Sequence, residues 1–201
     1  MSAHVIAQAP DEFKRTEFFA GYSNGQSGDV GTTEGSFTGL RPTTQHGFNL
    51  SGVYNLTRYF GIKGDFSATY KDQDITSTST GGAGTQTIRY RANTSLYNFL
   101  GGVQFKDNGS TRRLKPFAHA LVGVGHRRIG FSDFECTPDQ VCAAVVSGET
   151  GRTGLAGAFG GGLDITIKNR IQFRVIQADY NPVRVFGRTE HNARFGAGIV
   201  F

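Results

Sequence analysis

The chain has 201 residues, enough for one large domain, and its 29 Gly and only 5 Pro are typical of neither a disordered nor a collagen-like chain. No segment approaches the roughly 18 consecutive apolar residues of a membrane helix, which excludes a helical membrane protein. The formal charge of +5 comes from Lys and Arg scattered singly or in pairs, which argues against the dense basic stripe of a nucleic-acid-binding surface.

Residues 1–12 precede the first alternating pattern in the chain. They include Ala7-Gln8-Ala9, which matches the A-x-A form of a signal-peptidase site. We therefore expect a short N-terminal tail, either the remnant of a signal peptide or a tag, followed by one folded domain at residues 13–201.

Eight segments then alternate between apolar and polar residues with a period of two, which predicts half-buried strands. Their approximate ranges are 16–24, 45–56, 60–70, 87–105, 115–129, 155–167, 171–180 and 192–201. The clearest is 60–70, where Phe66 and Tyr70 share an apolar face and Lys63 and Asp65 share the opposite face. The alternation changes phase between Leu96 and Tyr97 and again after Val175, and each change predicts a β-bulge.

The connections between these segments alternate in length. Short turns lie near Arg58, Asn108 and Asn169, whereas the longer polar stretches 25–44, 71–86, 130–152 and 181–191 are expected to be exposed loops. This alternation is typical of up-and-down membrane barrels, which have short periplasmic turns and long outer loops. The sequence thus predicts an all-β fold, an eight-stranded antiparallel up-and-down transmembrane β-barrel.

Four segments resemble the small eight-stranded OmpA/OmpX-type outer-membrane barrels, and in particular their single-domain members. They are 115–120 (Lys-Pro-Phe-Ala-His-Ala), 159–164 (Phe-Gly-Gly-Gly-Leu-Asp), 174–180 (Arg-Val-Ile-Gln-Ala-Asp-Tyr) and 195–201 (Phe-Gly-Ala-Gly-Ile-Val-Phe). The resemblance implies a monomer in the bacterial outer membrane, in contact with its lipid and lipopolysaccharide, with no cofactor and no nucleic-acid partner. It also implies that the barrel-insertion machinery recognises Phe201. No peptidoglycan-binding domain follows residue 201, so we do not expect the anchoring role of full-length OmpA proteins.

An eight-stranded barrel is just wide enough for side chains to fill its interior. The predicted inward-facing charges comprise three residues of each sign: Lys63, Asp65, Asp164, Arg174, Asp179 and Arg194. Because an unpaired buried charge is very unfavourable, we expect them to pair across the lumen, with Arg174 binding Asp164 or Asp179. A polar core that closes the lumen is favoured over a gate or proton path, since the interior leaves little room for flow.

Cys136 and Cys142 are the only cysteines, and turn residues lie between them. We expect a disulfide that pins a loop, formed in an oxidising compartment. A metal or redox pair is disfavoured because no third ligand lies nearby in sequence and the spacing exceeds that of a C-x-x-C motif. No metal site is predicted.

A catalytic site is the remaining possibility, because some small outer-membrane barrels are enzymes. His126, Ser132 and Asp133 are the candidates, but residue order alone does not define a catalytic triad, and we predict no catalytic residue. The favoured function is a non-enzymatic integral outer-membrane barrel with a structural or surface-interaction role. The alternatives are a narrow ion or small-solute channel and a lipid-modifying enzyme. A soluble lipocalin-like barrel is disfavoured because its apolar face points inward.

Overall fold

The computed structural model describes residues 13–27, 44–81, 84–137, 148–168, 171–185 and 187–201. They form eight strands: β1 (Thr16–Ser27), β2 (Thr44–Asn55), β3 (Phe60–Gly81), β4 (Gly84–Lys106), β5 (Leu114–Thr137), β6 (Gly148–Lys168), β7 (Ile171–Val185) and β8 (Arg188–Val200). Within these ranges, no helix is long and apolar enough to cross a membrane. The expected tail at residues 1–12 lies outside the described residues.

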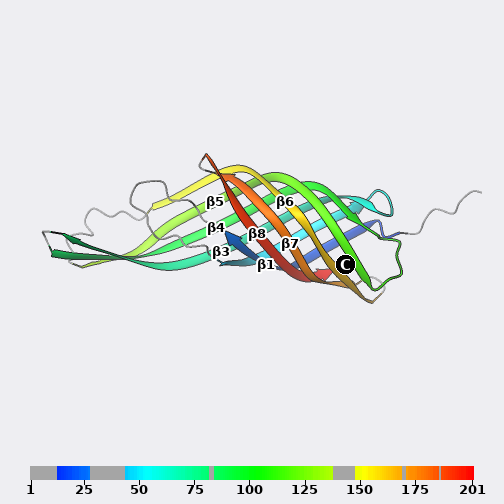
Figure 1. Cartoon of the computed structure of the whole chain (residues 1–201), viewed down its shortest axis with the longest axis horizontal. Coiled ribbons are helices and arrows are strands. Elements are labelled where there is room, and N and C mark those ends of the chain that lie inside the picture. The colour runs from blue at the N-terminus through cyan, green and yellow to red at the C-terminus, as the bar shows by residue number, and fades with distance from the viewer. Residues whose placement is uncertain (1–12, 28–43, 82–83, 138–147, 169–170, 186) are drawn as a thin grey trace, which may run out of the picture.

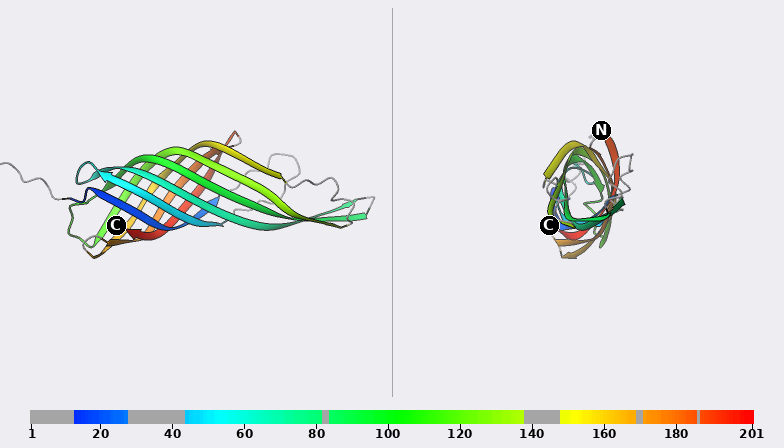
Figure 2. Two further views of the ribbon diagram at one scale, coloured as in Figure 1. Left: turned by 180° about the vertical axis from the view of Figure 1, so that it is seen from behind. Right: turned by 90° about the vertical axis from the view of Figure 1, so that its left-hand side faces the viewer.

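Each strand pairs antiparallel with the next along the chain, and β8 pairs back with β1, so the sheet closes into a barrel. The closing register includes Phe19↔Val200 and Tyr22↔Ala197. Figures 1 and 2 show the tilted strands and the ring of ribbons seen end-on. The predicted eight-stranded up-and-down topology is confirmed.

The barrel has its apolar side chains outside. The exposed fraction is 62% for Phe18 and 56% for Phe99, whereas Lys63, Asp164 and other charged residues on the opposite faces are buried. On the outer surface Phe66 packs against its neighbours on the adjacent strands, with ring centroids 5.8 Å from Phe48 and 4.6 Å from Phe99. The period-two pattern therefore places apolar residues on the outer surface of the barrel and charged residues toward its axis, an arrangement suited to a lipid environment.

One end of the barrel, here called the turn end, carries the connections after β2 and β4 together with Phe201, which pairs with Phe18 through backbone hydrogen bonds of 2.8 and 3.2 Å. The opposite end, here called the outer end, carries a long projection of β3, β4 and β5 (Figure 1). These strands have 22, 23 and 24 residues, about twice the 9–11 that cross a bilayer at a tilt.

The expectation of exposed loops is therefore wrong for 71–81, 84–86, 130–137, 148–152, 181–185 and 188–191, which belong to strands. Residues 82–83, 138–147 and 186 of these stretches, and residues 28–43 of the loop expected at 25–44, lie outside the described residues. The Ser/Thr-rich stretch after Tyr70 pairs in continuous register with β4 as far as Gly81↔Gly84, and β7 pairs with β8 as far as Val185↔Arg188. Thr and other β-branched residues suit a paired strand, and the ion pair of Arg91 with Asp74 at 3.0 Å joins the two arms of the hairpin. The local polarity of this stretch thus belongs to an exposed, paired strand.

One of the two predicted bulges is confirmed. The β7·β8 register shifts between Arg174 and Gln177, and both Val175 and Ile176 are exposed on the outer surface. The bulge predicted between Leu96 and Tyr97 is wrong, because the β4·β5 register runs regularly there and shifts instead between Arg89 and Arg91. Leu96 breaks the apolar-out pattern because it faces inward and joins an apolar cluster inside the barrel.

A charge on the outer surface tests this polarity. Replacing Phe99 by Arg should lower the free energy of unfolding in a lipid bilayer by about 2–4 kcal/mol, because the guanidinium would face hydrocarbon. Ser77→Arg, at an exposed position of the projection that faces Ile88 in the β3·β4 register, is the matched control and should be nearly neutral. Urea unfolding in vesicles measures both, and an unaltered stability of the Phe99 variant would contradict a lipid-facing surface.

Candidate functional site

Near the turn end, Lys106 is the centre of the buried polar contacts. Its Nζ donates to Glu17 Oε2 at 2.9 Å, to Asp164 Oδ2 at 2.8 Å and to Gln172 Oε1 at 2.8 Å. The ammonium group has three donors, and all three find acceptors on different strands. Lys106 therefore connects β4 to β1, β6 and β7 through the interior.

Arg174 lies next to this cluster and shares Asp164 with Lys106. Its Nε and Nη2 donate to the two oxygens of Asp164 at 2.8 and 3.2 Å, and its Nη1 donates to Gln177 at 2.7 Å. The guanidinium carbon lies 4.4 Å from the ring centroid of Phe19 and 4.0 Å from that of Phe117. The bidentate contact and the two aromatic faces hold the cation in a single orientation.

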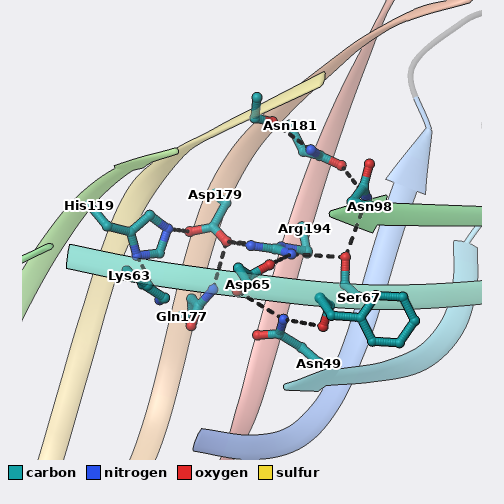
Figure 3. Close-up of polar contacts among 12 residues, drawn as sticks. Asn49, Lys63, Asp65, Ser67, Asn98, His119, Gln177, Asp179, Asn181 and Arg194 are labelled. Carbon is teal, nitrogen blue, oxygen red and sulfur yellow. Dashed lines mark hydrogen bonds and ion pairs between the residues drawn. The ribbon is translucent and has the colours of Figure 1, made fainter. Parts of the chain in front are cut away.

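Arg194 forms the second centre, drawn in Figure 3. Its guanidinium donates to Asp179 Oδ2 at 2.7 Å, to Asp65 Oδ1 at 2.7 Å and to Ser67 Oγ at 2.9 Å. Gln177 joins the two centres, because its amide group accepts from Arg174 and donates to Asp179 at 2.7 Å. The buried charges thus form one connected network.

His119 lies on the other side of Asp179, with Nε2 2.9 Å from Asp179 Oδ1 (Figure 3). Lys63 Nζ lies 3.2 Å from His119 Nδ1. An ammonium group can only donate, so Nδ1 accepts, and we assign the ring proton to Nε2, which faces the carboxylate. In this arrangement the imidazole is neutral and lies between the Lys63 ammonium group and the Asp179 carboxylate.

The buried network balances its charge. The cations are Lys63, Lys106, Arg174 and Arg194, and the anions are Glu17, Asp65, Asp164 and Asp179. With His119 neutral, four charges of each sign cancel. Because a buried charge without a partner costs several kcal/mol, this balance is what allows a closed interior to hold ions at all.

The rest of the described interior is filled by amides and by aliphatic side chains. Asn98 donates to Ser67 and to Asn181, both at 3.3 Å, beside a space of about 10 Å³, roughly the room of one water. A buried apolar cluster lies on the β4–β7 side of the interior and comprises Leu96, Leu100, Leu121, Ala156, Ala158, Val183 and Val185. Nearer the outer end, Arg127 and Glu190 form an ion pair at 2.6 Å.

All six residues predicted to face the lumen are buried, and five of them take part in ion pairs with each other or with Lys106. Lys63 is the exception, because its nearest polar partner is His119. The prediction missed Glu17, Lys106 and His119. Alternation alone could have found Glu17 and His119, which occupy inward positions of their segments, whereas Lys106 adjoins a turn.

The sequence candidates for catalysis are not brought together. His126 Nδ1 lies 2.8 Å from Thr153 Oγ1, and Ser132 contacts Asp133 at 3.4 Å. Ser132 is six residues from His126 along β5, roughly 20 Å at the spacing of a strand. Cys136 lies near the end of β5, whereas Cys142 lies outside the described residues. The disulfide between Cys136 and Cys142 therefore stays a prediction.

At the turn end, Arg58 clamps two neighbouring connections together. Its Nε and Nη2 donate to the two carboxylate oxygens of Asp107 at 2.7 and 3.2 Å, and its backbone oxygen accepts from Asn108 at 2.9 Å. The hydrogen bonds from Arg58, with its positive charge, hold the pKa of Asp107 below its usual value.

The closed sheet, the apolar outer surface and the ionic interior define an eight-stranded β-barrel of the outer-membrane type. No protein-family model and no curated protein matches the chain. Among solved structures, it is similar to Ail, the attachment invasion locus protein of Yersinia pestis, at 19% identity and a TM-score of 0.59, covering 94% of this chain and 100% of Ail. A second structure of Ail, with the heparin analogue sucrose octasulfate, has 19% sequence identity and a TM-score of 0.57, covering 93% of this chain and 98% of Ail. Neisserial surface protein A has 10% sequence identity and a TM-score of 0.55, covering 92% of this chain and 95% of that protein. These likenesses establish the fold.

The network predicts a large effect at Arg174. Arg174→Ala should lower the free energy of unfolding by about 3–5 kcal/mol, because Asp164 and Gln177 lose their partner inside the barrel. Thermal unfolding in detergent micelles measures the change, with the exposed Arg113→Ala as control. An unchanged midpoint for Arg174→Ala would show that the buried charges do not act as one network.

The Arg58 clamp predicts the titration of Asp107. Because its pKa is lowered in the folded protein, the carboxylate stabilises the fold at neutral pH, and this contribution is lost as the pH falls below about 4. Arg58→Gln should raise the pKa of Asp107 toward its ordinary value, whereas Arg112→Gln, in the connection that contains Asp107, should not. A carboxyl chemical-shift titration measures both, and an identical Asp107 curve in the Arg58 variant would contradict the clamp.

Proposed function

We propose that this protein is an integral bacterial outer-membrane barrel without enzymatic activity, closed by its own side chains, with a structural or surface-interaction role. The observation that carries the proposal is the charge-balanced network centred on Lys106 and Arg194, which joins seven strands through the interior. Such a network is compatible with lipid outside and leaves little space for a solute inside.

The alternative of a channel is disfavoured by the filling of the interior. Arg194 reaches from β8 to Asp65 on β3, so its side chain lies across the path that an ion would take. The apolar cluster that includes Leu96 and Leu121 adds a dry surface beside it. An ion would have to break several charge-assisted hydrogen bonds or lose its hydration shell to pass.

Among the described residues, His126 and Ser132 do not form a catalytic arrangement that would support a lipid-modifying activity. His126 is paired with Thr153 and lies far from Ser132 along β5. The surface role is supported by the projection at the outer end. There Tyr90 packs against Phe131 and Phe134, with ring centroids 5.8 and 5.6 Å apart, and Arg91 pairs with Asp74 and Asp133. Rigid elements that extend beyond a membrane are well placed to contact other molecules.

We propose that the apolar band contacts outer-membrane lipid and lipopolysaccharide, that the barrel-insertion machinery recognises the terminal Phe201, and that the protein is a monomer. The exposed ring of Phe201 at the turn end is consistent with recognition before insertion is complete.

Planar-bilayer recording tests the closed interior. The refolded protein, verified by its shifted gel mobility before and after boiling, should produce no stable conductance steps, because side chains occupy the lumen. The insertion control is protease protection of the same sample in vesicles. Stable, large steps from a correctly folded and inserted sample would contradict the proposal and support the channel.

A further inference from the structure

The turn end of the barrel has an excess of positive charge. Outside the interior network, the described residues of this end include one acidic side chain, Asp107, which pairs with Arg58 at 2.7 Å. The basic side chains of the same end are here called the basic arc, and they are Lys14, Arg15, Arg58, Arg112, Arg113, Lys115 and Lys168. Because the interior charges cancel, the basic arc is the main source of the formal charge of +5.

Backbone hydrogen bonds place the members of the basic arc along one continuous rim. The backbone oxygens accept at 2.8 to 2.9 Å from neighbouring elements: that of Arg15 from the end of β2, that of Arg58 from the connection after β4, and that of Arg113 from the end of β6. Figure 1 shows the start of β1 (blue) and the connections after β2 (cyan) and β4 (green) at this end. The basic arc therefore follows the rim of the barrel from β1 to β6.

Apolar side chains of the outer surface end directly beside these cations. Three exposed apolar residues are each adjacent in sequence to a member of the basic arc: Tyr59 to Arg58, Leu114 to Arg113, and Ile167 to Lys168. The exposed fraction of Ile167 is 69%, and the guanidinium carbon of Arg58 lies 5.2 Å from the ring centroid of Tyr59. The cations therefore lie where the apolar band ends, which is the level of the lipid headgroups.

At the outer end, by contrast, basic side chains are accompanied by acidic ones. Arg91 pairs with Asp74 at 3.0 Å and with Asp133 at 3.4 Å, and Arg128 pairs with Glu149. Within the described part of the turn end, Arg112, Arg113 and Lys168 are exposed and form no ion pair with one another or with Asp107. The two ends of the barrel therefore present different charge to the two leaflets of the membrane.

We propose that the basic arc binds the phosphodiester groups of anionic phospholipids in the periplasmic leaflet, which the short turns of such barrels face. Long basic side chains can extend from the edge of an apolar surface to the headgroups, where each cation is attracted by the negative membrane surface. A position on the rim beside exposed apolar side chains favours a lipid over a soluble acidic partner. The proposal rests on the membrane contacts proposed above and names the lipid class at this end.

Tryptophan quenching by brominated lipids tests this preference, because the chain contains no Trp of its own. Ile167→Trp places a reporter beside Lys168, and the refolded full chain is measured in phosphatidylcholine vesicles that contain either brominated phosphatidylglycerol or brominated phosphatidylcholine. The anionic lipid should be enriched about fivefold at the reporter, the effect of one cation at a membrane surface. In the reporter chain, Arg112→Gln/Arg113→Gln/Lys168→Gln should lower this enrichment below about twofold, because the nearest cations are lost. The matched control, Arg89→Gln/Arg152→Gln/Arg184→Gln, removes the same charge at exposed positions of the outer end and should leave the enrichment unchanged.

A loss of enrichment confined to the turn-end variant supports the proposal. An equal loss in both triple variants would show attraction to net charge alone, and equal quenching by the two lipids in the reporter chain would show no headgroup preference; either result overturns the proposal. Binding of soluble polyglutamate without enrichment of the anionic lipid would assign the basic arc to an acidic soluble partner instead. All variants should keep the gel mobility of the folded barrel, so failure of the lipid preference leaves the closed membrane barrel untouched.

Discussion

The structure depends on the cancellation of charge inside a closed sheet. Closing eight strands into a barrel satisfies the backbone and removes every edge, but it also forces alternate side chains into a narrow interior. Arg194 on β8 meets this constraint by binding Asp179 on the neighbouring strand and Asp65 on β3, beyond the β1–β8 junction. The same contacts that neutralise the interior also hold the two ends of the sheet together.

The alternation of side chains predicted the number of strands, their order and which face meets lipid, because these properties follow from a period of two within each segment. The length of the strands did not follow, because it depends on pairing between segments. The stretch after Tyr70 looks like a flexible loop on its own, yet its register with β4 continues to Gly81↔Gly84. Leu96 likewise looked like a change of phase, although it is an apolar residue facing inward.

The site was predictable to the extent that inward positions could be counted. Arg174, Asp164 and Arg194 could be placed by parity, but their partners could not, because contacts across a lumen join residues distant in sequence. Lys106 contacts Glu17 from 89 positions away along the chain. The neutral state of the His119 ring could not be predicted either. It is assigned from the positions of Lys63 and Asp179 on either side of the ring, which decide which ring nitrogen carries the proton.

The two faces of the sheet can be distinguished directly by nuclear Overhauser effects between lipid and protein in nanodiscs. The account predicts cross-peaks from acyl-chain methylene protons to the rings of Phe66, Phe159 and Phe195, and none to the side chains of Arg174 and Arg194. Cross-peaks from water to those rings, with no acyl-chain cross-peaks to them, would contradict a lipid-facing apolar surface and with it the membrane assignment.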